Sequence, residues 1–197
     1  MKRFLIRMSL GTAALLMLAA SGGFAVDSGV DILANRTYVH RDSKTALRVS
    51  AGWNVSEPFR LRKTTTTSIL SIDKADPRIS VTVVWTPLDK KTEWNKVIRA
   101  AEDEDLGAEY GVLLAVYGKA KVSRPTTIRS GPFTVFKVLI DDGPEGPSKS
   151  AGAVYLFEAG SGENRWKVKV RAVFPQLNRD DSIRQVEALI DQFGNAQ

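Results

Sequence analysis

The sequence predicts an α+β fold in which an antiparallel β-sheet is flanked by helices, in outline an α/β sandwich. Segments whose apolar residues alternate with polar ones outnumber segments with helical spacing. Two of the alternating segments flank Gly160-Ser161-Gly162, a connection typical of a β-hairpin. An amphipathic helix is expected over residues 178–193. Strands joined by hairpins, together with a few one-sided helices, indicate an antiparallel sheet with helices packed against it.

Residues 1–25 have the features of a cleavable secretion signal. A positively charged start is followed by an almost wholly apolar run over residues 8–20 and by small residues up to Ala25. The run is shorter than the ~20 residues that a transmembrane helix requires, which disfavours the alternative of an uncleaved membrane anchor. We therefore expect export by the general secretory pathway, a periplasmic or secreted protein, and no stable membrane insertion after cleavage.

Cleavage would also change the composition of the chain. All three methionines lie in the first 25 residues and the sequence has no cysteine, so the remaining chain contains no sulfur. Disulfides, cysteine-based zinc sites, iron–sulfur clusters and thiol nucleophiles are thereby excluded, and we expect no cofactor. Lys2, Arg3 and Arg7 leave with the signal, so the net charge falls from +6 to +3, with 25 basic against 22 acidic residues. A small charge in an exported protein argues against nucleic-acid binding.

One domain is expected over residues 45–197, because a chain of this length with ordinary apolar content fits a single core. Residues 26–44 are polar and aperiodic, which is typical of a loose lead-in. Residues 46–55 then predict a strand that ends in a turn and places Leu47 and Trp53 on one apolar face.

Two more strands precede a change of period. Residues 67–73 are rich in β-branched side chains, and residues 78–86 alternate apolar with polar residues. Residues 92–105 keep the spacing of one helical stripe. Residues 108–117 keep the same spacing over a shorter length that includes Gly111, which favours a helix there over a strand.

The second half begins with strands. Residues 121–129 lead into a Gly-Pro turn, and residues 133–141 are apolar on both faces, as expected of a central strand. Residues 151–158 and 165–174 form the predicted hairpin.

The predicted helix at residues 178–193 has recognisable ends. Asn178 is a candidate N-cap, and Asp180 and Asp181 lie in the first turn, where the helix dipole favours negative charge. Gly194 lies just past the expected end of the helix.

The order of elements resembles that of the PsbP-like superfamily, named for an extrinsic subunit of photosystem II. The matching features are an early strand ending in Gly52-Trp53, paired strands through Trp85, a helix at Trp94, a long antiparallel run and a terminal helix at residues 182–193. The resemblance covers residues 45–193, with Ala51 where the family often has a proline. It implies an accessory or binding module for a larger assembly, and it carries over no functional residue.

His40 is the only histidine, with Asp42 and Ser43 close by in sequence. A catalytic triad is assembled by the fold, however, and a lead-in segment is poorly suited to orient an imidazole. A solvated loop histidine is therefore favoured over a catalytic one. A single histidine also excludes a histidine-rich zinc site.

Two groups of carboxylates are weak candidates for a metal site. The first is residues 102–105, and the second is Asp141, Asp142 and Glu145. Their oxygens could bind calcium, but neither group has the ligand spacing of an EF-hand loop. A solvated helix end and a solvated loop are favoured, and no metal is expected.

The most informative polar residues alternate along the strand at residues 165–174. Arg165, Lys167, Lys169 and Arg171, which we call the basic row, must share one face of a strand. The row predicts a contact surface for an anionic partner. The alternatives are an ordinary solvated sheet face, with long side chains lying over apolar neighbours, and protection of an edge strand.

These features favour an exported, non-enzymatic accessory or binding module. Its expected partner is an envelope protein or an anionic envelope polymer, contacted in part through the basic row. The alternatives are a hydrolase that uses the carboxylates of residues 141–145 and a purely structural envelope protein.

Overall fold

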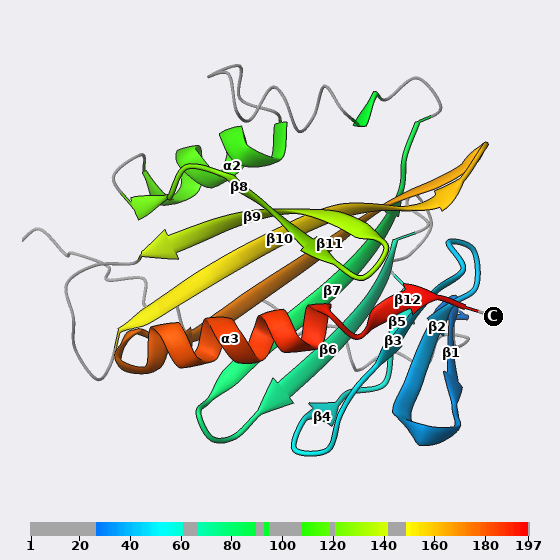
Figure 1. Cartoon of the computed structure of the whole chain (residues 1–197), viewed down its shortest axis with the longest axis horizontal. Coiled ribbons are helices and arrows are strands. Elements are labelled where there is room, and N and C mark those ends of the chain that lie inside the picture. The colour runs from blue at the N-terminus through cyan, green and yellow to red at the C-terminus, as the bar shows by residue number, and fades with distance from the viewer. Residues whose placement is uncertain are drawn as a thin grey trace, which may run out of the picture.

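The computed structural model describes residues 27–60, 67–89, 93–94, 108–118, 121–141 and 149–196, which form two antiparallel sheets and two main helices (Figure 1). The expected antiparallel α+β class is confirmed at this level. The predicted signal, most of the helix predicted at residues 92–105, Asp142 and Glu145 lie outside the described residues. Among the residues that are described, no helix is both long and apolar enough to cross a membrane.

The larger sheet contains eight strands. Seven follow one path and the eighth, β5, pairs only with β6. In spatial order they are β4 (Asn54–Val55), β6 (Ser68–Lys74), β7 (Ile79–Pro87), β11 (Asn164–Pro175), β10 (Ser150–Ser161), β9 (Phe133–Asp141) and β8 (Thr126–Ser130), with β5 at Phe59–Arg60.

The predicted hairpin is confirmed as β10 and β11, which pair without interruption from Ser150↔Pro175 to Ser161↔Asn164. Its turn needs glycine, because Gly160 has φ 84° and a Cβ there would lie 2.0 Å from the carbonyl oxygen of Asn164. Since β11 also pairs with β7, it runs through the middle of the sheet.

A second, four-stranded sheet has the order β1 (Val30–Leu33), β2 (Thr37–His40), β3 (Thr45–Arg48) and β12 (Phe193–Asn195). The expectation of a loose lead-in at residues 26–44 is therefore wrong for residues 30–40. β1 and β2 are each four residues long and carry polar side chains, so the alternation that places Tyr38 and His40 in the interior is too short to recognise from sequence.

The strand predicted at residues 46–55 is two strands in different sheets. β3 ends at Arg48 and β4 begins at Asn54, and Gly52 between them has φ 90°. Leu47 and Trp53 are both buried, as predicted, because both sheets face the same core. A positive φ at Gly52 lets the chain leave one sheet and enter the other.

The two helices accompany opposite faces of the larger sheet. α2 (Ala108–Tyr117), the helix favoured from the sequence, packs against β9 and β10 through a cluster that includes Leu113, Phe136 and Val154. α3 (Arg179–Ile190) packs on the other face with the four-stranded sheet, over a core that includes Val170 and Val186. Figure 1 shows the two helices on either side of the strands.

The last helix is shorter than predicted. Asn178 occupies the N-cap position but its side chain makes no capping hydrogen bond. α3 ends at Ile190 rather than at residue 193, because Phe193 pairs with Leu47 and Gly194 with Ala46. The segment read as the last helical turn is therefore a strand.

Candidate functional site

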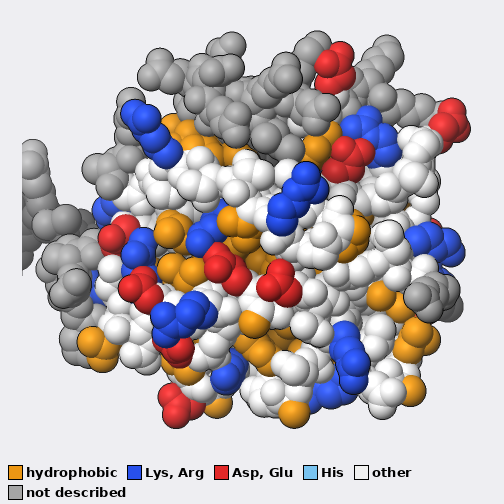
Figure 2. All heavy atoms as spheres, in the orientation of Figure 1, with side chains coloured by type: hydrophobic (Ala, Val, Ile, Leu, Met, Phe, Trp, Pro, Cys, Tyr) orange, Lys and Arg blue, Asp and Glu red, His pale blue; other side chains and the backbone are white. Residues whose placement is uncertain are grey.

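The basic row lies on β11, in the middle of the larger sheet. Its four cations alternate with buried residues such as Trp166, Val168 and Val170, so they share the sheet face that carries α2. Arg171 is exposed, whereas the other three side chains are half-buried. Figure 2 views the molecule in the orientation of Figure 1 and shows basic and acidic side chains interspersed.

One end of the row is compensated within the sheet. Arg165 forms an ion pair with Glu158 on β10, and this contact raises the pKa of the guanidinium. Glu158 also stands directly opposite Lys167 in the register of the hairpin. Opposite charges on neighbouring strands stabilise a sheet, so this end of the row has a structural role of its own.

The other end of the row opens onto a groove. Arg171 Nη2 donates a hydrogen bond of 2.6 Å to the hydroxyl of Tyr117, at the end of α2. Beside this pair lies a shallow hollow, partly open to solvent, with a cavity volume of about 30 Å³. We call this hollow the Arg171 groove, and it is lined by Tyr117, Ile140, Ser150, Ala151, Gly152, Arg171, Ala172 and Val173.

One glycine of the sheet is among the residues that line the groove. Gly152 on β10 stands between Ile140 on β9 and Val173 on β11. Gly152 places no side chain between these two neighbours; it is itself buried, as is Ile140, whereas Val173 is 39% exposed. A Cβ built at Gly152 would lie 3.7 Å from the Cβ of Ile140, so it would occupy the floor of the groove.

The lining of the groove combines two kinds of contact. Val173 and the half-buried Tyr117 offer apolar surface, and Arg171 offers a guanidinium at the margin of the groove. A guanidinium binds carboxylates and phosphates through paired hydrogen bonds. The arrangement suits a ligand or a partner segment with an anionic group next to an apolar one.

His40 is not a solvated loop residue, contrary to the expectation from sequence. It lies at the end of β2, has 0% exposure, stacks on Trp85 and meets Trp166 edge-on. The sequence carried a weak signal for this position, since His40 shares the two-residue alternation of Tyr38.

Both ring nitrogens of His40 have partners. Nδ1 accepts from the backbone N–H of Ser43 at 3.1 Å, and Nε2 lies 3.2 Å from the hydroxyl of Ser68 on β6. Ser68 in turn donates to the carbonyl of Ser28 at 2.7 Å. A neutral imidazole with its proton on Nε2 satisfies every one of these contacts.

Burial is the main reason that the pKa of His40 is lowered from 6.5 to about 4. The carboxylate of Asp42 opposes the shift, and the cations Arg60 and Arg41 reinforce it. A buried, neutral and fully bonded imidazole cannot reach a substrate. The position of His40 therefore does not support a catalytic role for this residue.

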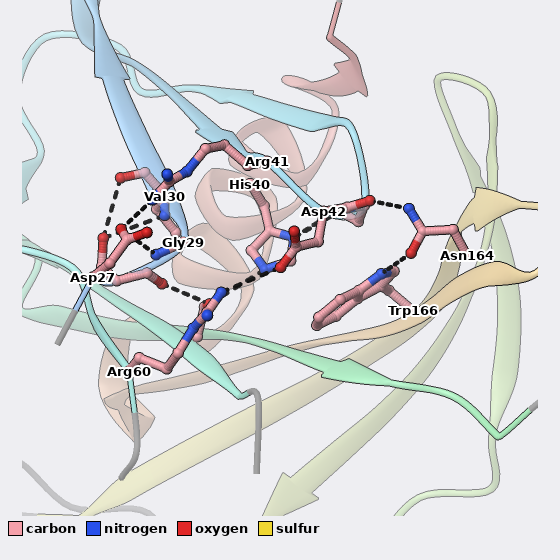
Figure 3. A network of polar contacts seen from close by, with 12 residues as sticks. Asp27, Gly29, Val30, His40, Arg41, Asp42, Arg60, Asn164 and Trp166 are labelled. Carbon is pink, nitrogen blue, oxygen red and sulfur yellow. Dashed lines mark hydrogen bonds and ion pairs between the residues drawn. The ribbon is translucent and has the colours of Figure 1, made fainter. Parts of the chain in front are cut away.

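The surroundings of His40 fasten the smaller sheet to the larger one (Figure 3). Arg60 on β5 lies 3.2 Å from a carboxylate oxygen of Asp42, and Asn164 donates to the backbone carbonyl of Asp42. Trp166 Nε1 donates to Asn164 at 2.8 Å. The network thus joins the turn after β2 to β5 and to the tip of the β10–β11 hairpin, which is a structural task.

Within the described residues, the structure does not assemble the candidate carboxylates into a site. Asp141 ends β9 as an exposed residue and is not among the residues that line the Arg171 groove. Asp142, Glu145 and residues 102–105 lie outside the described residues. Within the part of the chain that the structure describes, no three His, Asp or Glu side chains come together as metal ligands.

No protein-family model and no curated protein matches this sequence. Among solved structures, the fold is similar to that of LpqN, described as involved in cell envelope biogenesis of Mycobacterium tuberculosis. The TM-score is 0.50 at 9% identity, over 76% of this chain and 81% of LpqN. At this identity the similarity shows a shared fold alone, and the PsbP-like resemblance inferred from the sequence stays a prediction.

Proposed function

We propose that this chain is an exported, envelope-associated binding module without catalytic activity, and that it contacts its partner at the Arg171 end of the basic row. The partner is an envelope protein or an envelope polymer that presents anionic groups. The contact is centred on the Arg171 groove, where charge and apolar surface occur together.

The observation that carries this proposal is the difference between the two ends of the row. Arg165 is half-buried and ion-paired with Glu158 inside the sheet. Arg171 is exposed and is held by a neutral hydroxyl, that of Tyr117, which leaves its charge uncompensated by that contact. An exposed guanidinium in a fixed position beside apolar surface is a common anchor of protein interfaces.

Two further observations support the proposal. The fold is shared with a protein involved in cell envelope biogenesis, which agrees with a role in the same compartment. The single histidine of the chain is occupied as a buried structural residue, which removes the general base that hydrolytic enzymes use most often.

The test is affinity capture from an envelope extract with the processed chain, residues 26–197, as bait. We expect a partner that is retained at low salt and released at high salt, because exposed charge contacts are screened. The variants R171Q and K167Q/K169Q should both reduce capture, with R171Q giving the larger effect because its side chain is the exposed one.

The matched control is R48Q, which removes an exposed cation from β3, outside the basic row. Capture by R48Q should equal that of the unchanged protein, and all variants should melt within a few degrees of it. Capture that survives R171Q and K167Q/K169Q together would show that the basic row is not the contact surface.

A further inference from the structure

Hydroxyl side chains border Arg171 on the side of the sheet that leads to β7 and β6. Thr82 on β7 stands directly opposite Arg171, and Ser71 on β6 stands opposite Thr82. In the neighbouring row, Ser80 on β7 stands opposite Val173. The residues before and after each of these along its strand are buried in the core, so the hydroxyls share with Arg171 the face of the sheet that carries α2.

The Arg171 groove adds two more hydroxyls. The hydroxyl of Tyr117 accepts its hydrogen bond from Arg171, so its own proton can be donated to a further acceptor. Ser150 also belongs to the lining of the groove. Arg171 and Tyr117 thus form a pair of donors at the margin of the groove, and such a pair suits a carboxylate.

A carboxylate of the protein lies at the far end of the same surface. Asp73 on β6 is exposed and stands opposite Ser80. Neighbouring strands are ~4.8 Å apart, which places β6 about 10 Å from the strand that carries Arg171. The surface therefore has a cation at β11, a hydrogen-bond acceptor at β6 and hydroxyls between them. Asp73 disfavours a second anionic group at β6 and suits the neutral hydroxyls of a ligand there.

This composition differs from the core of a protein interface. Such a core is apolar and rich in aromatic residues, and a stable interface buries roughly 800 Å² on each partner. The hollow at Arg171 has a cavity volume of about 30 Å³, and among the residues of this surface named above Val173 is the one exposed apolar side chain. Hydroxyls both donate and accept hydrogen bonds, which matches the hydroxyls of a sugar.

We propose that the partner bound at the Arg171 groove is a polysaccharide that carries carboxylate groups. One carboxylate binds the guanidinium of Arg171 and the hydroxyl of Tyr117. The hydroxyls of the adjoining sugar bond to Thr82, Ser71 and Asp73. The inference rests on the proposed function, and it names the class of partner that the same site recognises.

The test is binding of the processed chain to immobilised polygalacturonate, with uncharged dextran measured beside it. We expect binding to polygalacturonate that salt weakens, and little binding to dextran. The variant T82V/S71A should weaken binding to polygalacturonate by about tenfold, because two hydrogen bonds are lost while the charge of the protein is unchanged. R171Q should abolish the binding.

The matched control is T86V, which removes a half-buried hydroxyl from the same strand and face as Thr82, but opposite Lys167. T86V should bind like the unchanged protein. Polygalacturonate binding that only equals dextran binding, or that T82V/S71A leaves unchanged, would overturn the assignment of a polysaccharide. An envelope protein that is captured by the unchanged chain and lost with R171Q would also overturn it, while the proposed function would stand. Capture that survives R171Q and K167Q/K169Q together removes the proposed function itself.

Discussion

The imidazole of His40 lies flat against the indole of Trp85, with ring centroids 5.2 Å apart and planes inclined by 2°. Trp85 also donates its Nε1 proton to Thr45 at 3.0 Å, so the two rings bring β2, β3 and β7 together. The interface between the two sheets is therefore partly polar and built around an uncharged imidazole.

Acid should destabilise the fold through His40. Its pKa is about 4 in the folded protein and near 6.5 in the unfolded chain, so the unfolded state binds the proton more tightly. The contribution of His40 is complete above pH 6.5 and is lost as the pH falls towards 4, by up to about 3 kcal/mol. Urea unfolding across this range measures it, and H40Q should lose this part of the slope. The same slope in H40Q would contradict the assignment.

Removing the acceptor of the Trp85 proton should also be costly. T45V keeps the shape of the side chain but leaves a buried N–H without its partner, which costs about 1–3 kcal/mol. Chemical denaturation of T45V gives the value. T127V, at an exposed position on β8, is the control and should change stability by less than ~0.5 kcal/mol. A T45V protein as stable as T127V would show that the hydrogen bond is dispensable.

Phe193 should be essential to the smaller sheet. Its ring is 5.1 Å from that of Phe157 and 6.5 Å from that of Trp85, centroid to centroid, and it is buried in the shared core. F193A is expected to lower the free energy of unfolding by about 3–5 kcal/mol. F59A removes a ring that is partly exposed on β5 and should cost clearly less. Similar losses in thermal unfolding for both variants would argue against β12 as a core strand.

Filling the floor of the Arg171 groove should weaken binding of the envelope partner at a small cost in stability. G152A places a Cβ 3.1 Å from the carbonyl oxygen of Ala172, so we expect a loss of about 1 kcal/mol and weaker capture of the envelope partner. G194A, where a Cβ meets nothing within 4 Å, is the matched control. Melting temperature and capture are measured on both variants. Full capture by G152A would place the partner outside the groove.

The long elements of this fold could be predicted because their sequence patterns extend over nine to twelve residues. β11 was predicted from alternation, β9 from a run that is apolar on both faces, and the hairpin of β10 and β11 from the glycines between the two strands. β1, β2 and β12 were missed because each has only three or four residues, too few for a period. Their identity as strands comes from pairing with distant segments, which no local pattern encodes.

The candidate site was predictable only in part. The alternation of the basic row follows from the sequence, but the compensation of Arg165 by Glu158 depends on a register that the structure alone supplies. The groove is lined by Gly152, Ile140 and Val173, which lie on three different strands. His40 was misread for the same reason, since Ser68 and Trp85, which surround it, are remote in sequence.

The pairing of β12 with β3 means that the smaller sheet can be completed only when both ends of the described chain are present. Residues near 194 must meet residues near 46 before the smaller sheet has its fourth strand and Phe193 covers Trp85. Contacts between such distant residues form late and slowly. A chain that crosses a membrane with its first residues leading would therefore stay open until its last strand had passed. β12 would then pair with β3 on the far side of the membrane, after transport is complete.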